Sequence, residues 1–170
     1  MNTKTLATVA LLIALSFVGA QLTIMGTIAF DSLPAFLAAL LLGPFHGAVI
    51  GFLGHMLTAL TSGFPFSLPL HFVIALSMAL TMYVFGTAYK TFVKKFHKST
   101  ALTITGVIGM IFNIPVSLTF SIAALWLLAG RETALGLLIL LPALTMATIA
   151  NIAASIALFK ILGNIWSKNS

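Results

Sequence analysis

The chain has 170 residues, of which 61% are hydrophobic and only 6% are charged. Because a soluble domain carries about 25% charged residues, this composition excludes a soluble globular protein, a disordered chain and a nucleic-acid-binding module. It predicts a single all-α integral membrane domain over residues 1–170, and the absence of cysteine excludes disulfide bonds and thiolate chemistry.

Six apolar segments follow one another along the chain. Gly43-Pro44 separates the second from the third, because proline cannot continue a helical hydrogen-bond ladder; one long kinked helix is the alternative here. The start of the chain also resembles a signal peptide ending at Val18-Gly19-Ala20, but the apolar segments that follow favour a first membrane helix. The expected helices cover residues 5–24, 33–42, 45–61, 68–89, 100–129 and 134–162.

The basic residues predict the orientation of these helices. Six crossings place both termini on the same side as the loop between the fourth and fifth helices, and Arg131 is then the only basic residue opposite. By the positive-inside rule, both termini are cytoplasmic. The seven basic residues expected inside are Lys4, Lys90, Lys94, Lys95, Lys98, Lys160 and Lys168.

Few polar side chains interrupt the apolar segments. His55 lies in the third, Asn113 in the fifth two residues before Pro115, and Asn151 in the sixth, while His71 begins the fourth near the outer surface. An ionisable group at mid-membrane costs about 2.5 kcal/mol or more, so such residues usually serve a purpose. They either hydrogen-bond a neighbouring helix or contact a ligand, and the sequence leaves both possibilities open.

The loops expected outside carry the other notable groups. Asp31 is the only aspartate of the chain, and Arg131 is its only arginine. Phe64, Phe66 and Trp126 are expected at a similar level, where aromatic residues form either an interfacial belt or part of a small-molecule pocket.

The sequence lacks the motifs of several kinds of ATP-binding and catalytic site. The chain has no G-x-x-x-x-G-K-[ST] phosphate loop, no G-x-S-x-G elbow and no H-E-x-x-H metal helix. His46, His55 and His71 are expected at different depths, which argues against a shared metal site. We therefore predict no catalytic residue, no cofactor and no metal. Two alternatives remain: a membrane enzyme with His55 or His71 beside Asp31, and an ATP-independent facilitator with a continuous polar path.

Several short stretches carry a family resemblance. They are FDSLP at 30–34, LGPFHGA at 42–48, Gly54-His55, TALTSGFP at 58–65 and Pro69-Leu70-His71, together with the A-x-x-x-A pair Ala10 and Ala14. In this order they resemble the substrate-binding S components of energy-coupling factor (ECF) vitamin transporters. The stretch from Gly54 to His71 looks most like members for cobalamin precursors, notably α-ribazole; biotin, riboflavin, thiamine, folate and pantothenate remain open.

The resemblance implies a function and partners. An S component binds a vitamin or precursor near the outer face of a prokaryotic plasma membrane. It docks on a transmembrane coupling protein that carries two cytoplasmic ATPases, here through Ala10 and Ala14, and topples to deliver its ligand inside. Metal-binding members carry an N-terminal Met-His pair, whereas Met1-Asn2 stands here. The substrate-binding residues that we expect are Asp31, His55, Phe64, Phe66, His71, Asn113, Trp126, Arg131 and Asn151.

Overall fold

The computed structural model describes residues 3–21, 23–24 and 28–169. The regular secondary structure of the described residues is helical apart from one antiparallel pair of two-residue strands, β1 (Thr23–Ile24) and β2 (Ile28–Ala29), and the predicted all-α class is confirmed. The α-helices are α1 (Thr3–Gln21), α2 (Leu33–Leu41), α3 (Pro44–Thr61), α4 (Leu68–Phe92), α5 (Lys98–Ile111), α6 (Ser117–Ala129), α7 (Arg131–Gly136) and α8 (Leu141–Asn169).

The six predicted segments are present. The fifth consists of α5 and α6 joined by a π-helical turn, η1 (Phe112–Val116), and the sixth of α7 and α8 joined by a 3-10 turn, η2 (Leu137–Leu140). The first helix, predicted over residues 5–24, was too long at its C-terminal end, because Thr23 and Ile24 belong to β1. Four helices among the described residues are long and apolar enough to span a membrane: Thr3–Gln21, Leu68–Phe92, Lys98–Ala129 and Arg131–Gly163.

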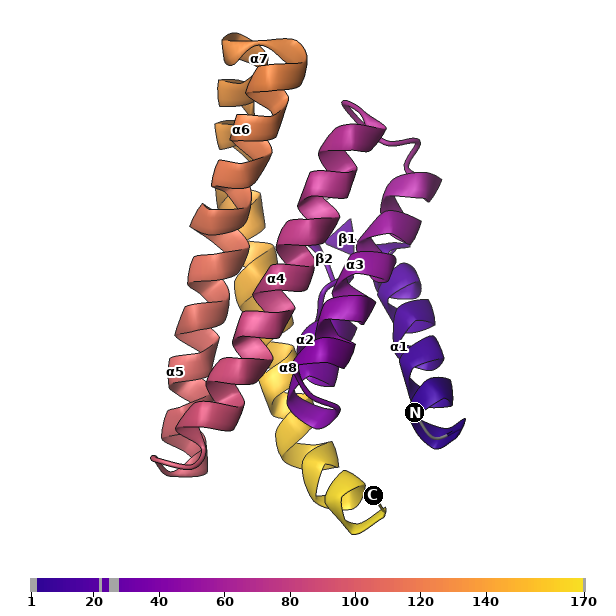
Figure 1. The fold of residues 1–170 in the computed structure, drawn as a ribbon, viewed down its shortest axis with the longest axis vertical. Coiled ribbons are helices and arrows are strands. Elements are labelled where there is room, and N and C mark those ends of the chain that lie inside the picture. The colour runs from indigo at the N-terminus through magenta and orange to yellow at the C-terminus, as the bar shows by residue number, and fades with distance from the viewer. Residues whose placement is uncertain (1–2, 22, 25–27, 170) are drawn as a thin grey trace.

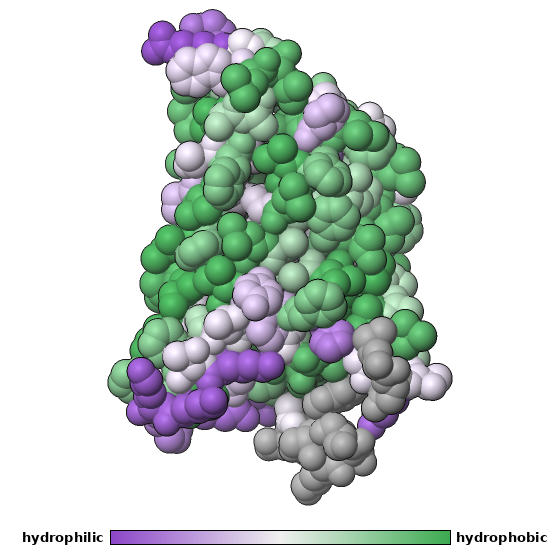
Figure 2. Space-filling model, in the orientation of Figure 1, coloured by the Kyte–Doolittle hydropathy of each residue, from purple (hydrophilic) through white to green (hydrophobic). Residues whose placement is uncertain are grey.

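The helices run alternately up and down, and the start of α1 lies near the same end of the molecule as the end of α8 (Figure 1). A hydrophobic band covers the middle of the surface in Figure 2, and hydrophilic atoms gather at its two ends, near α7 and near the connection of α4 to α5. This distribution is that of a multi-pass membrane protein. Which end is cytoplasmic remains a prediction from the lysines.

Gly43 separates α2 from α3, as the Gly-Pro pair predicts. Its φ of 101° lies in the left-handed region, which glycine adopts without steric cost. The nine residues of α2 extend only about 14 Å at 1.5 Å per residue, roughly half of the hydrocarbon thickness. The second predicted helix is therefore present, but it is too short to cross a membrane by itself.

Close packing of small residues holds α2, α3 and α4 together. A Cβ placed on Gly47 would lie 2.6 Å from Ala39 Cβ, and one on Gly86 would lie 2.8 Å from Pro44 Cα. Beside these contacts, Phe36 of α2 and Phe85 of α4 meet edge to face, with ring centroids 4.9 Å apart, and both are fully buried. These three helices thus form a tightly packed support for the polar residues described next.

The connection between α1 and α2 lies deeper than predicted. Figure 1 shows β1 and β2 at mid-height, well away from the α3–α4 and α6–α7 connections. The Phe30 amide donates to the Gly19 carbonyl at 3.2 Å, so the chain turns back against the end of α1. Asp31 therefore does not lie in an outer loop, as the sequence suggested, and is brought into the middle of the bundle.

Candidate functional site

A polar cavity of about 190 Å³ lies among the connection to α2, the helices α3, α4 and α8, the turn η1 and the start of α6. Four residues singled out from the sequence line it together: Asp31, His55, Asn113 and Asn151. The other lining residues are Ser32, Ile74, Met78, Ser117, Leu144, Ala147 and Thr148. The lining therefore combines a carboxylate, an imidazole, two amides and three hydroxyls with aliphatic side chains.

The π-helical turn η1 positions Asn113. Pro115 lies inside this turn and donates no backbone hydrogen bond, and the Ser117 amide reaches back five residues to the Phe112 carbonyl. Asn113 Nδ2 donates to Thr148 Oγ1 of α8 at 2.8 Å. The irregular turn at Pro115 thus places the Asn113 amide at the cavity.

Asn151 lies one turn beyond Thr148 on the same face of α8. Its side chain is only 1% exposed, and its Nδ2 donates to the Ala147 carbonyl at 2.8 Å. Ser117, which lines the cavity at the start of α6, shares a buried hydrogen bond of 2.8 Å with the hydroxyl of Ser77 on α4. These hydrogen bonds hold the polar side chains of α6 and α8 in place beside the cavity.

Asp31 and Ser32 enter the cavity just before α2 begins. Ser32 Oγ donates to Asp31 Oδ1 at 3.0 Å. Desolvation raises the pKa of the Asp31 carboxyl above its usual range, and the hydrogen bonds that Ser32 makes to it oppose this rise. Pro34 stands in the first turn of α2, where its missing N–H costs no helical hydrogen bond, so the helix can begin directly after this polar pair.

His55 and His71 contact each other, contrary to the expectation that they lie at different depths. His55 Nε2 lies 3.2 Å from His71 Nδ1, and the rings stack with centroids 5.3 Å apart. His71 Nε2 lies 2.9 Å from the Pro65 carbonyl oxygen in the α3–α4 loop. Even so, among the described residues no three histidine, cysteine or acidic side chains group closely enough to hold a metal ion.

The remaining predicted residues lie outside the cavity. Phe64 packs edge-on against His71 with centroids 5.9 Å apart, and Phe66 is 64% exposed. Trp126 is 53% exposed on α6, and Arg131 is exposed at the start of α7. Aliphatic side chains, not these aromatic rings, form the apolar part of the cavity wall.

Sequence reasoning missed Ser32, Ser117 and Thr148. Ser117 follows Asn113 by four residues, and Thr148 precedes Asn151 by three, so each shares a helix face with a residue that had been singled out. Helical spacing would have found both. Ser32 sits beside Asp31, but nothing in the sequence showed that this connection folds into the bundle.

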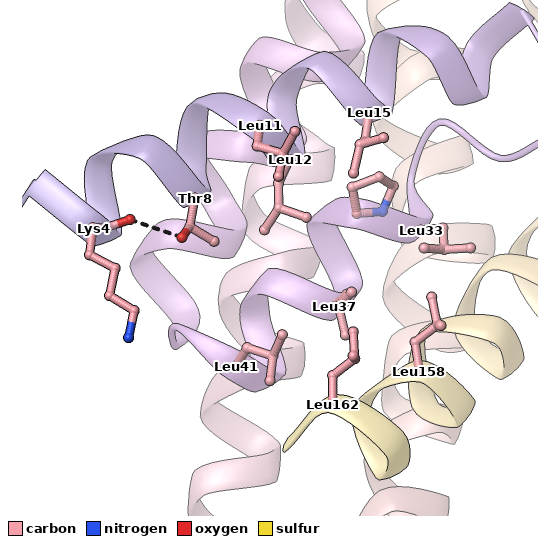
Figure 3. Close-up of a pocket in the computed structure, with 11 residues that line it drawn as sticks. Lys4, Thr8, Leu11, Leu12, Leu15, Leu33, Leu37, Leu41, Leu158 and Leu162 are labelled. Atoms are coloured by element: carbon pink, nitrogen blue, oxygen red, sulfur yellow. Dashed lines mark hydrogen bonds between the residues drawn. The ribbon is translucent and has the colours of Figure 1, made fainter. Parts of the chain in front are cut away.

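A larger groove of about 430 Å³ lies between α1, α2 and α8. Figure 3 shows leucines of all three helices converging on it, with Lys4 and Thr8 at one end. The Thr8 hydroxyl donates to the Lys4 carbonyl at 2.9 Å and is engaged within α1. With an almost wholly aliphatic lining, this groove lacks the convergent polar groups that select a polar small molecule.

Comparison with known proteins decides the family. One family model matches residues 4–163, and it describes the substrate-specific component of ECF transporters. The chain belongs to this family. Searches of curated proteins and of solved structures gave no match.

Membership defines the role of the chain at a coarse level. The S component is the substrate-binding part of a transporter and not an enzyme, so its substrate is a small molecule and its partners form an ECF module. The enzyme and facilitator alternatives are thereby set aside. Within this S component, the polar cavity is the candidate for substrate recognition.

Proposed function

We propose that the polar cavity of this S component binds a vitamin-type molecule, with α-ribazole or a related cobalamin precursor as the best candidate. The observation that carries this proposal is the convergence of Asp31, His55, Asn113 and Asn151 on one cavity inside an apolar bundle. Polar groups at that depth are costly, and several from five parts of the chain in one place are typical of a ligand site.

The lining suits a ligand with a sugar and an aromatic ring. The carboxylate, the amides and the hydroxyls can hydrogen-bond ribose hydroxyls, and Ile74, Met78 and Leu144 offer an apolar surface to a dimethylbenzimidazole ring. Phe64, Phe66, Trp126 and Arg131, which lie outside the cavity, would meet the ligand during entry. This arrangement differs from the aromatic pocket expected from the sequence.

The size of the cavity implies a conformational change on binding. Sites for drug-sized ligands enclose about 300–1,000 Å³, whereas this cavity encloses about 190 Å³. Asp31 and Ser32 come from a connection and not from a helix, so movement of this connection can widen the cavity without unfolding any helix.

The substrate proposal is tested by identifying what the protein binds. Mass spectrometry of small molecules that co-purify with it, followed by calorimetry with a vitamin panel, is expected to give α-ribazole or a cobalamin precursor. Binding of pantothenate, riboflavin, thiamine, folate or biotin would replace the substrate and leave the family assignment intact. No binding of any cobalamin precursor would refute the α-ribazole proposal.

Replacement of Asn113 by leucine tests whether the polar cavity is the substrate-binding site. Asn113→Leu keeps the branched shape and the number of side-chain heavy atoms but removes the amide and its bond to Thr148, so affinity is expected to fall about ten- to a hundredfold. The matched control is Thr119→Val, because Thr119 is exposed on α6 and its hydroxyl bonds only to the Pro115 carbonyl. Equal affinities of the two variants by calorimetry would rule out the cavity as the binding site.

The energy for transport would come from partner subunits. We propose that a transmembrane coupling protein with two cytoplasmic ATPases receives this chain in a prokaryotic plasma membrane, with the lysine-rich end inside. Ala10 and Ala14 are exposed on α1, opposite the buried face of Val9, Leu12 and Ser16. Such a small-residue face lets another helix approach closely, which supports docking there and toppling of the bound chain.

A further inference from the structure

The hydrogen bonds of His71 determine which nitrogen of its ring carries the proton. The Pro65 carbonyl oxygen can only accept, so His71 Nε2 donates to it across 2.9 Å. In a neutral His71 the other nitrogen, Nδ1, then has no proton and acts as an acceptor. The α3–α4 loop therefore fixes the tautomer of a histidine on α4.

The same reasoning extends to His55. Its Nε2 lies 3.2 Å from His71 Nδ1, and because that nitrogen accepts, His55 Nε2 must donate. A neutral His55 then has no proton on Nδ1. Since His55 lines the polar cavity and its Nε2 is engaged by His71, Nδ1 is the nitrogen that remains for a ligand, and it is an acceptor.

We propose that this chain of hydrogen bonds makes His55 a specificity-determining residue that accepts a hydrogen bond from an N–H or O–H group of the ligand. His71 is a positioning residue, because it determines which nitrogen of His55 donates and which accepts, without itself lining the cavity. The proposal rests on the proposed function of the cavity and names the ligand chemistry it selects: a neutral donor, such as a sugar hydroxyl, opposite His55.

Protonation turns His55 Nδ1 from a hydrogen-bond acceptor into a donor. One extra proton on either ring leaves an N–H at His55 Nδ1, and protons on both rings place two N–H groups face to face and break the His55–His71 bond. A ligand that places an N–H or O–H group opposite His55 Nδ1 then binds more weakly. Asp31 lines the same cavity and is the other titratable group close to the pair among the described residues.

The other titratable groups on the helices packed against α3 lie elsewhere. Lys4 stands at the far end of α1, and α2 has no titratable residue. On α4, the next such residues are at least three turns beyond His71; they are Tyr83, Tyr89 and Lys90.

Nitrogen NMR of the ligand-free protein tests the tautomers directly. With ¹⁵N-labelled histidine in nanodiscs at neutral pH, His55 and His71 are both expected to show a protonated Nε2 and an unprotonated Nδ1. Assignments come from single substitutions, and in His71→Phe the tautomer of His55 is expected to become mixed. His46→Gln, at the opposite end of α3, is the control and should leave His55 unchanged. A proton on Nδ1 of neutral His55 would overturn the proposal.

Binding of α-ribazole and its three monodeoxyribose analogues tests whether His55 accepts a hydrogen bond from a ribose hydroxyl. His55→Phe keeps a ring but no acceptor and is expected to weaken α-ribazole binding about tenfold, whereas His55→Gln keeps an acceptor and should retain most of it. One deoxy analogue should bind the wild type about tenfold more weakly, with no further loss in His55→Phe. If the loss of affinity caused by His55→Phe and the loss caused by removing a hydroxyl combine in full for each of the three analogues, no hydroxyl bonds to His55 and the proposal is overturned.

Acidification separates His55 from Asp31. Affinity is expected to fall as His55 takes up a proton, and this fall should be absent in His55→Gln, while any contribution of Asp31 remains in both proteins. The same fall in both would contradict the assignment to His55. If no cobalamin precursor binds at any pH, the proposed substrate fails, but the NMR spectrum still decides the tautomers.

Discussion

Replacement of Ala10 and Ala14 by leucine is expected to abolish transport while leaving substrate affinity unchanged. The two alanines lie four residues apart on the exposed face of α1, so in the proposed docking both side chains would meet the same partner helix. Leucine at both positions pushes the backbones apart and removes the close packing on which helix association in a membrane depends. Transport in liposomes that contain the coupling module and ATP is therefore expected to fall to the background.

The control for this double variant is an alanine exposed on another face. Ala123 is exposed on α6, and Ala123→Leu should transport like the wild type. Co-purification with the coupling module and calorimetry separate the possible defects: the double variant should bind substrate normally but lose the module. Wild-type recovery of the complex would show that α1 does not dock through these alanines.

Replacement of Gly47 by leucine is expected to prevent α2 and α3 from packing. A Cβ on Gly47 would lie 2.6 Å from Ala39 Cβ and 2.8 Å from Ala39 Cα, and the latter belongs to a backbone that cannot rotate away. Overpacking of a rigid contact costs about 1–3 kcal/mol, and the branched leucine reaches further than a single Cβ. Thermal unfolding followed in detergent should show a large fall in stability, or no folded protein.

Alanine variants make this test more exact. Gly47→Ala should destabilise by about 1–3 kcal/mol despite the better helix propensity of alanine. A Cβ added to Gly136 of α7 would meet none of the described residues within 4 Å, so Gly136→Ala should gain about 0.5–1 kcal/mol. Similar unfolding temperatures for the two variants would contradict the close α2–α3 contact.

The helices could be predicted from the sequence because local signals mark their ends. Gly43-Pro44 marked the break between α2 and α3, and Pro115 marked the irregular turn that holds Asn113. The contact of His55 with His71 was also within reach. His55 lies six residues before the end of α3, and His71 three after the start of α4, so in antiparallel helices they differ in height by only about one turn.

The depth of Asp31 could not be predicted in the same way. The residues around it are short and weakly patterned, and the turn back from α1 depends on the Phe30–Gly19 hydrogen bond and on the fit of Gly19 against the Phe30 carbonyl. Those contacts are tertiary and leave no periodic signal. Likewise, Trp126 and Phe66 were expected at a pocket because of their residue type, but their side chains face outward.

The short α2 is enclosed by its neighbours, because its residues from Pro34 to Leu40 are all buried. In Figure 1, α1 and α2 end at mid-height, while α6 and α7 extend furthest toward the opposite end. Of these two helices only α1 has exposed leucines, Leu11 and Leu15 among them, so the lipid beside it meets an apolar wall that reaches less far than α6. Bilayers relieve such hydrophobic mismatch by thinning or by tilting the protein. We therefore expect the protein to tilt in a bilayer toward the side that carries Ala10 and Ala14.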